Sequence, residues 1–238
     1  MNRQSNTYTI IYSTVLVIVV GVVLSVVYQA LRPRQIENIQ NDTKRQILAA
    51  VRVVPQKGET VSQLFDKYIT ASYIVNDKGQ KIDPKEDAFN VKVSLEVKKP
   101  ADERLLPVFE CQTDNGLKYI IPVYGAGLWG PIWGYVAFDN NGDTIYGAYF
   151  AHQGETPGLG AEIEKPAFSD QFEGKNIFSP DGVFTSVAVS KVGKEPQGQA
   201  WVHAVSGGTI TSQGVQSMLF DSLEPYSAFF KSLKGSAL

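Results

Sequence analysis

The chain has 238 residues, of which 43% are hydrophobic and 19% are charged, and its formal net charge is −2. This composition excludes a disordered chain and suffices for one sizeable domain or two small ones. The 22 basic residues are matched by 24 acidic ones, so we expect no nucleic acid partner. One cysteine, Cys111, and two histidines, His152 and His203, exclude a disulfide framework, a cysteine-rich zinc site and an iron–sulfur cluster bound by this chain alone.

A transmembrane helix is predicted near the N-terminus, over about residues 8–31. The 28 residues from Gln4 to Leu31 carry no charge, and a hydrocarbon core of about 30 Å needs about 20 helical residues. The apolar run is longer than that of a signal peptide, and no small-x-small cleavage site precedes Arg32, which favours an uncleaved anchor. We therefore expect an N-terminal segment, 1–34, embedded in membrane lipid, and one soluble domain, 35–238.

The charges beside this helix bear on its orientation. Four basic residues follow the helix, and only Arg3 and the amino terminus precede it; the four are Arg32, Arg34, Lys44 and Arg45. By the positive-inside rule alone, this distribution favours a cytoplasmic soluble domain.

The soluble domain is predicted to be of the α+β class. Apolar spacing predicts a helix over 35–54, and Thr60 with Gln63 matches a capping box for a short helix through Tyr68. A helical period over 212–230 predicts a C-terminal helix that covers one face of a sheet. Short antiparallel strands, with residues 139–143 as a hairpin turn between the last two, are predicted over 71–76, 89–95, 117–123, 132–138 and 144–150.

The first segment that could carry chemistry is the glycine-rich stretch 125–130, which matches G-x-G-x-x-G literally. A dinucleotide site needs a helix directly behind the glycines, whereas residues 131–137 alternate like a strand. Two interpretations stay open. The stretch is an ordinary turn between strands, or its glycines let the backbone approach a planar ligand, with Leu128 and Trp129 supplying apolar contacts.

The second segment, 152–160, follows a predicted strand and precedes a short helix from Ala161. Its three glycines and one proline can hold backbone N–H groups in a fixed concavity, and Thr156 adds a hydroxyl donor. A ring or a phosphate could be recognised there. An ordinary long turn explains the composition equally well.

The third segment, 206–214, places Gly207 and Gly208 among four hydroxyl residues directly before the C-terminal helix. Free backbone N–H groups and the positive end of a helix dipole would lie where an anion binds, which suggests phosphate handling. The alternative is simple helix capping by Ser and Thr. No lysine follows the glycines, so this is not a Walker loop.

Side chains for classical catalysis are few. Neither histidine has a nucleophile or acid partner that the sequence assigns, and Cys111 in a strand-like segment is typical of a small buried apolar residue. Two histidines do not fill a usual zinc site. We therefore expect no catalytic residue and no metal site in this chain.

Taken together, these features resemble the family formed by the C subunit of the sodium-translocating NADH:quinone reductase. The matching stretches are the N-terminal span, Gly-Leu-Trp-Gly at 127–130, Glu-Thr-Pro-Gly-Leu-Gly at 155–160, and Ser-Gly-Gly-Thr-Ile-Thr-Ser at 206–212. The last stretch alone is shared with the wider FMN-binding domain family, which includes the G subunit of the Rnf electron-transport complex. The resemblance covers nearly the whole chain and implies one FMN-binding domain with an antiparallel sheet and covering helices.

The resemblance also implies a covalently bound cofactor. In this family a flavin transferase, using FAD, joins FMN by a phosphoester bond to the threonine that closes a Ser-Gly-Ala-Thr motif. The matching threonine here is Thr209, after Ser206, Gly207 and Gly208. Gly208 stands where alanine is usual, and His203 stands where the recognition motif often has aspartate.

Other positions are implied as cofactor contacts. The resemblance places Thr156 and Leu159 near the isoalloxazine ring, with Leu128 and Trp129 close by and Lys191 as a polar contact. Thr211 belongs to the same motif as Thr209 and is the nearest rival for the attachment.

The resemblance implies the role of an electron relay in a bacterial inner-membrane complex. Other subunits of that complex oxidise NADH, reduce ubiquinone and move sodium, so this chain needs no NADH site and no stand-alone catalysis. The family's soluble domain lies on the periplasmic side, and we follow the resemblance over the charge count because long domains translocate despite flanking charge. The alternatives are a flavoprotein subunit of the Rnf type, or a membrane-tethered binding module without a cofactor.

Overall fold

The computed structural model describes residues 6–83 and 87–236. It divides into two compact units, Met1–Thr43 and Lys44–Leu238, which are taken separately below. Compactness does not define where a membrane ends, so the domain limits 1–34 and 35–238 stay a prediction.

The first helix, α1, runs from Asn6 to Ala50 without interruption and contains Pro33. Among the described residues it is the one helix that is long and apolar enough to cross a membrane, and the side chains of its most apolar stretch are unburied. The helix predicted over 35–54 is therefore the C-terminal part of α1, and it ends at Ala50 rather than at Val54. Arg52, at φ 61°, turns the chain out of the helix.

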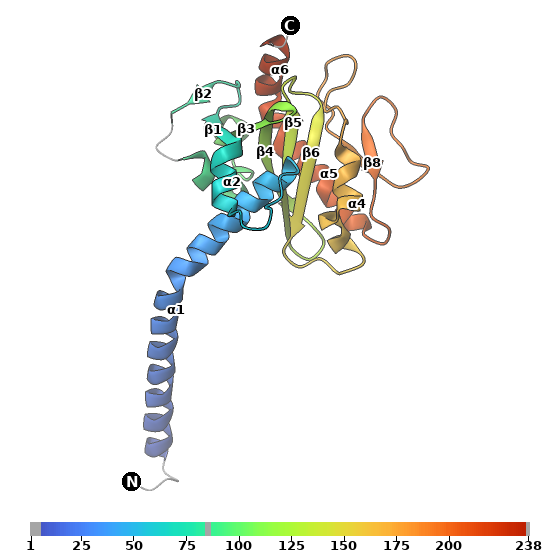
Figure 1. The fold of residues 1–238 in the computed structure, drawn as a ribbon. Helices are drawn as coiled ribbons and strands as arrows, with labels where there is room; N and C mark the ends of the chain where they lie inside the picture. Colours follow the sequence, from blue (N-terminus) through green and yellow to red (C-terminus); the bar gives the residue numbers. More distant parts are fainter. Residues whose placement is uncertain (1–5, 84–86, 237–238) are drawn as a thin grey trace. The chain divides into compact units, whose positions relative to one another are not determined.

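A six-stranded antiparallel sheet forms the centre of the second unit, with the strand order β2-β1-β3-β4-β5-β6 (Figure 1). The hairpin predicted between the last two strands is present. The strands are β1 (Ile69–Val75), β2 (Lys81–Ile82), β3 (Leu106–Thr113), β4 (Gly116–Ala126), β5 (Pro131–Asp139) and β6 (Ile145–His152). A separate parallel pair consists of β7 (Ala188–Ser190) and β8 (Trp201–His203). The α+β class is confirmed.

The predicted strand over 89–95 is wrong. This segment forms a 3-10 helix, η1 (Ala88–Asn90), and a short helix, α3 (Val93–Glu96). Its buried positions, Ala88, Val91 and Glu96, do not alternate, and Leu95 is 53% exposed. The strand pattern of this segment was therefore a false signal. The long strand that pairs with β1 is β3, whose segment around Cys111 was noted as strand-like but was not placed in the sheet.

Local sequence signals predicted some helices of the second unit and missed the limits of others. The capping box before α2 (Val61–Tyr68) is confirmed, because the Gln63 amide donates to Thr60 Oγ1 and the Thr60 amide donates to Gln63 Oε1. The predicted C-terminal helix is split by a 3-10 turn at Pro225, whose ring interrupts helical hydrogen bonding. The remaining helices are η2 (Ala101–Glu103), η3 (Gly160–Glu164), α4 (Pro166–Ser169), η4 (Asp170–Phe172), α5 (Thr209–Leu223), η5 (Glu224–Tyr226) and α6 (Ser227–Ser236).

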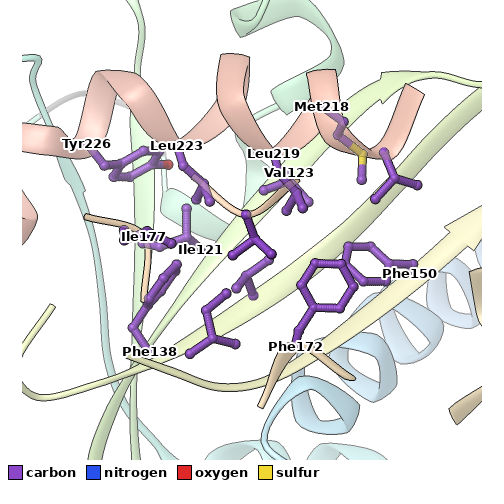
Figure 2. Packing of buried hydrophobic residues seen from close by; sticks show 14 of the residues in the cluster. Ile121, Val123, Phe138, Phe150, Phe172, Ile177, Met218, Leu219, Leu223 and Tyr226 are labelled. Atoms are coloured by element: carbon purple, nitrogen blue, oxygen red, sulfur yellow. The ribbon is translucent and has the colours of Figure 1, made fainter. Parts of the chain in front are cut away.

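Both faces of the sheet are covered. On one face, Met218, Leu219 and Leu223 of α5 pack against Ile121 and Val123 of β4, as Figure 2 shows. The opposite face packs against the end of α1 and against α2, in a cluster that contains Ile47, Val51, Phe109, Cys111 and Ile120. Burial from both sides explains why β4 has an unbroken buried run rather than an alternating one. The arrangement holds Gly214 and Met218 of α5 against the end of β4, at Gly125 and Ala126.

Cys111 lies in β3 and is fully buried, as expected for a structural thiol. Burial raises its pKa to about 11. We expect the folded chain to react with an aromatic disulfide reagent at pH 8 at least about tenfold more slowly than the chain unfolded in urea, because the thiolate is the reactive form. Equal rates in the two states would contradict this prediction.

Candidate functional site

The three segments singled out in the sequence meet at the side chain of Glu155. Its Oε1 accepts a hydrogen bond from the Trp129 amide at 2.8 Å, and its Oε2 accepts one from Thr211 Oγ1 at 2.5 Å. The Leu128 amide donates to the same carboxylate. One buried side chain thus joins the β4–β5 turn, the loop after β6 and the first turn of α5.

The electrostatics of Glu155 follow from these bonds. The residue is 4% exposed, and burial by itself raises the pKa of a carboxyl group. Donation from the Thr211 hydroxyl and from the amides of Trp129 and Leu128 outweighs burial and holds the pKa of Glu155 below its usual value. Glu155 is therefore a carboxylate at neutral pH.

Sequence reasoning did not single out Glu155. The available signal was an acidic residue inside a loop rich in glycine, directly before Thr156 and Pro157. A carboxylate in such a loop is usually solvated, and only the folded chain brings the amides of the β4–β5 turn to it. Sequence alone could not supply that contact.

The attachment candidate, Thr209, is the first residue of α5. It lines a groove of about 260 Å³ together with Lys191, Lys194, Ser212 and Gln213. Lys191, predicted as a polar contact, therefore shares the groove with Thr209, and Lys194 is a second cation there that the sequence analysis did not name. A helix N-terminus and two lysines make this groove suited to an anion.

The neighbouring motif residues have different surroundings. Thr211 is 1% exposed and its hydroxyl points to Glu155, whereas Ser206 is exposed. Gly207 has a φ of +73°, and a Cβ atom there would lie 2.5 Å from Leu159 Cδ2. Gly207 thus allows the 206–208 turn to approach the predicted ring-contacting loop closely.

The predicted ring contacts are exposed on loops. Trp129 is 69% exposed and Leu128 46%, in the turn that the Gly127 amide closes by donating to the Gly130 carbonyl. Leu159 is 43% exposed, and its amide donates to the Thr156 carbonyl within one turn. Large apolar side chains held at the surface by rigid turns offer walls for a planar ligand.

The two histidines have different surroundings. His152 Nδ1 accepts a hydrogen bond from the Glu155 amide at 3.1 Å and so supports the loop. His203 lines a second groove, of about 280 Å³, with Ser206 and Gly158. Across residues 6–83 and 87–236, no group of three or more His, Cys, Asp or Glu side chains is arranged to hold a metal ion.

Comparison with known proteins first identifies the class of protein to which the chain belongs. Residues 127–224, which include the β4–β5 turn, the loop after β6 and all of α5, match the family model of the FMN-binding domain. A groove suited to an anion at the start of α5, and exposed apolar side chains on the loops that Glu155 joins to this helix, agree with that class.

Relatives that match over nearly their whole length identify the family. The chain is 32% identical to the C subunit of the Na(+)-translocating NADH-quinone reductase of Pseudomonas aeruginosa, over 99% of both chains. The crystal structure of the same subunit from Parabacteroides distasonis is 47% identical, has a TM-score of 0.77, and is matched over 96% of its chain and 84% of this one. Shewanella oneidensis NqrC has a TM-score of 0.68 at 28% identity, over 82% of this chain and 98% of that one. This chain belongs to the NqrC family, the C subunits of the Na(+)-translocating NADH-quinone reductases.

Proposed function

We propose that this chain is the electron-relay flavoprotein subunit of a sodium-pumping NADH:ubiquinone oxidoreductase, with FMN joined by a phosphoester to Thr209. The observation that carries the proposal is the position of Thr209 at the N-terminus of α5, in a groove that Lys191 and Lys194 also line. A phosphate diester at this position is stabilised by free helix amides and by two cations.

Differences in burial support Thr209 over its neighbours as the attachment point. Thr211 is buried and donates its hydroxyl to Glu155, so an external flavin transferase has no access to it. Thr209 is partly exposed and faces a groove. Ser206, Gly207 and Gly208 form the turn before the helix, and their role in this proposal is to leave room around the phosphate.

The ring of the cofactor is proposed to lie against Thr156, Leu159, Leu128 and Trp129. FMN, when bound, supplies a ring that accepts one electron and passes one on. The protein contributes apolar walls, a hydroxyl donor and rigid turns, while the covalent tether keeps the cofactor at high effective concentration. Electron transfer then needs no catalytic side chain in this subunit.

Shortening an apolar side chain beside the flavin ring is expected to change the ring's surroundings without releasing the flavin. Leu159→Ala or Trp129→Ala should shift the flavin absorption maxima or the midpoint potential, because neither residue makes the covalent link. In-gel flavin fluorescence should stay at the wild-type level. Unchanged spectra and potentials in both variants would remove these residues from the site.

The partners and location follow from the same proposal. The chain would assemble with the other subunits of the reductase, be matured by a flavin transferase, and be anchored by α1 in the lipid of a bacterial inner membrane.

The soluble domain is proposed to lie in the periplasm. We expect alkaline phosphatase fused after Leu238 to be active, which would indicate a periplasmic domain. A strong cytoplasmic reporter signal without phosphatase activity would instead show that the charges after the apolar stretch of α1 decide the orientation.

The direct test of the function uses the wild-type chain. Co-expression with an active flavin transferase should give a band that fluoresces after denaturing electrophoresis and a mass increase that matches one esterified FMN. Expression without the transferase is the control and should give neither signal. Absence of both signals with a transferase that modifies another substrate would refute the flavoprotein hypothesis.

A further inference from the structure

We propose that Glu155 is a positioning residue that joins the ring-contacting loops to the attachment helix, and that its buried negative charge lowers the midpoint potential of the bound flavin. The inference rests on the proposed function, since it needs a flavin at this site. It concerns a residue of this chain that the motif for attachment does not include.

The contacts of Glu155 run to each part of the site. Its carboxylate accepts from the Trp129 amide at 2.8 Å, from the Leu128 amide, and from Thr211 Oγ1 at 2.5 Å. Thr211 lies two residues beyond Thr209 on α5, and Glu155 directly precedes Thr156. Movement of the carboxylate would therefore move the ring walls relative to the attachment point.

Two glycines make room for this carboxylate. A Cβ atom on Gly127 would lie 2.5 Å from Glu155 Oε1. A Cβ atom on Gly160 would meet both Glu155 Oε2 and Thr211 Oγ1. The β4–β5 turn and the loop after β6 are thus shaped around the charged group, which indicates a built site rather than a chance contact.

The charge itself acts on the redox equilibrium. All three groups donate hydrogen bonds to the Glu155 carboxylate and so stabilise its ionised form. The residue is only 4% exposed. His152, whose Nδ1 accepts from the Glu155 amide, is the ionisable neighbour of the carboxylate. Because each electron accepted by the ring adds negative charge, a nearby buried carboxylate disfavours reduction.

The size of the effect follows from Coulomb's law. For scale, two unit charges taken to be about 12 Å apart, across an effective dielectric constant of about 20, change an equilibrium constant about tenfold. For a one-electron couple, a tenfold change is about 59 mV. Removing the charge should therefore raise the midpoint potential by about that amount.

Glu155→Gln separates the charge from the positioning. Its amide oxygen can accept from the two backbone amides, and its amide nitrogen can donate to the Thr211 hydroxyl, so the contacts persist without the charge. The matched control is Glu164→Gln, because Glu164 lies nearby in η3 but its side chain is 40% exposed and its charge is screened. The full-length chain in detergent, flavinylated by co-expression, is titrated with redox dyes of known potential.

The expected result is a rise of about 59 mV in Glu155→Gln, equal to a tenfold shift for one electron, with less than about a third of that in Glu164→Gln. Equal potentials in the two fluorescent variants would overturn the electrostatic role while leaving the proposed function intact. A wild-type chain that carries no flavin would overturn both.

Two further measurements keep the proposal open to refutation if Glu155→Gln does not acquire flavin. Thr211→Val removes a donor from the carboxylate and is measured at pH 9, so that Glu155 stays ionised without this bond. The potential should fall, and a rise or no change would contradict the electrostatic role. In the flavin-free full-length chain, Glu155→Ala should speed amide exchange at Leu128 and Trp129 at least about tenfold over wild type, because both amides lose their acceptor. Unchanged exchange there would overturn the positioning role.

Discussion

Replacing Thr209 with valine is expected to abolish covalent flavin while leaving the chain folded and inserted. Valine keeps the shape of threonine but lacks the oxygen that the phosphoester requires. Thr209 is partly exposed at the first position of α5, so its hydroxyl is not needed to satisfy a buried partner. In-gel fluorescence after co-expression with the flavin transferase should fall at least about a hundredfold, to background, and the mass should equal that of the unmodified chain.

Matched variants in the same turn test whether the loss is specific. Ile210→Val, at a neighbouring position that is 53% exposed, removes one methylene group and should retain full fluorescence. Ser206→Ala removes an exposed hydroxyl from the motif and should retain it as well. Full fluorescence in Thr209→Val would show that the acceptor is another residue, with Ser206 the next candidate because Thr211 is buried.

A second large effect is expected from Gly214→Ala in the middle of α5. A Cβ atom there would collide with the carbonyl oxygen of Ala126 at the end of β4, and a backbone atom cannot rotate away. The overpacking cost of about 1–3 kcal/mol should exceed the gain of about 0.5–1 kcal/mol that alanine has over glycine within a helix. Because the same helix begins with Thr209, flavin attachment should also fall.

The control for this prediction is Gly235→Ala in α6, where nothing lies within 4 Å of the added Cβ atom. This variant should be as stable as wild type or more stable by up to about 1 kcal/mol, since only helix propensity changes. Both variants are compared by urea unfolding of the full chain in detergent. A Gly214→Ala chain that is as stable as Gly235→Ala would mean that α5 is not held closely against β4.

The proposed attachment motif and the glycine-rich loops could be singled out in the sequence because the features that mark them are local. Glycines before a helix, a threonine at its start and exposed apolar side chains in short turns depend on neighbouring residues only. Lys191, which the resemblance implied as a polar contact of the cofactor, lines the same groove as Thr209, and its role there stays a prediction. Lys194 lies in the same groove, but the sequence of its loop did not indicate where its side chain points.

Residues whose partners lie far along the chain could not be found from local sequence patterns. Glu155 is joined to Trp129, 26 residues earlier, and to Thr211, 56 residues later. Neither partner offers a pattern in the sequence, because a backbone amide exists at almost every residue and a threonine near a helix start is common. The importance of the carboxylate therefore became visible only when the folded loops surrounded it.

Four features follow from the amino-acid sequence without further information: the helix apolar enough to cross a membrane, the capped helix α2, the β5–β6 hairpin and the α+β class. Hydrophobic length, caps and turns act over a few residues, so local patterns specify them. Three others needed the folded chain: the helical turns at 88–96, the place of β3 between β1 and β4, and the closure of the site by Glu155. Strand pairing and the burial of a charge depend on partners far along the chain, which local preference does not specify.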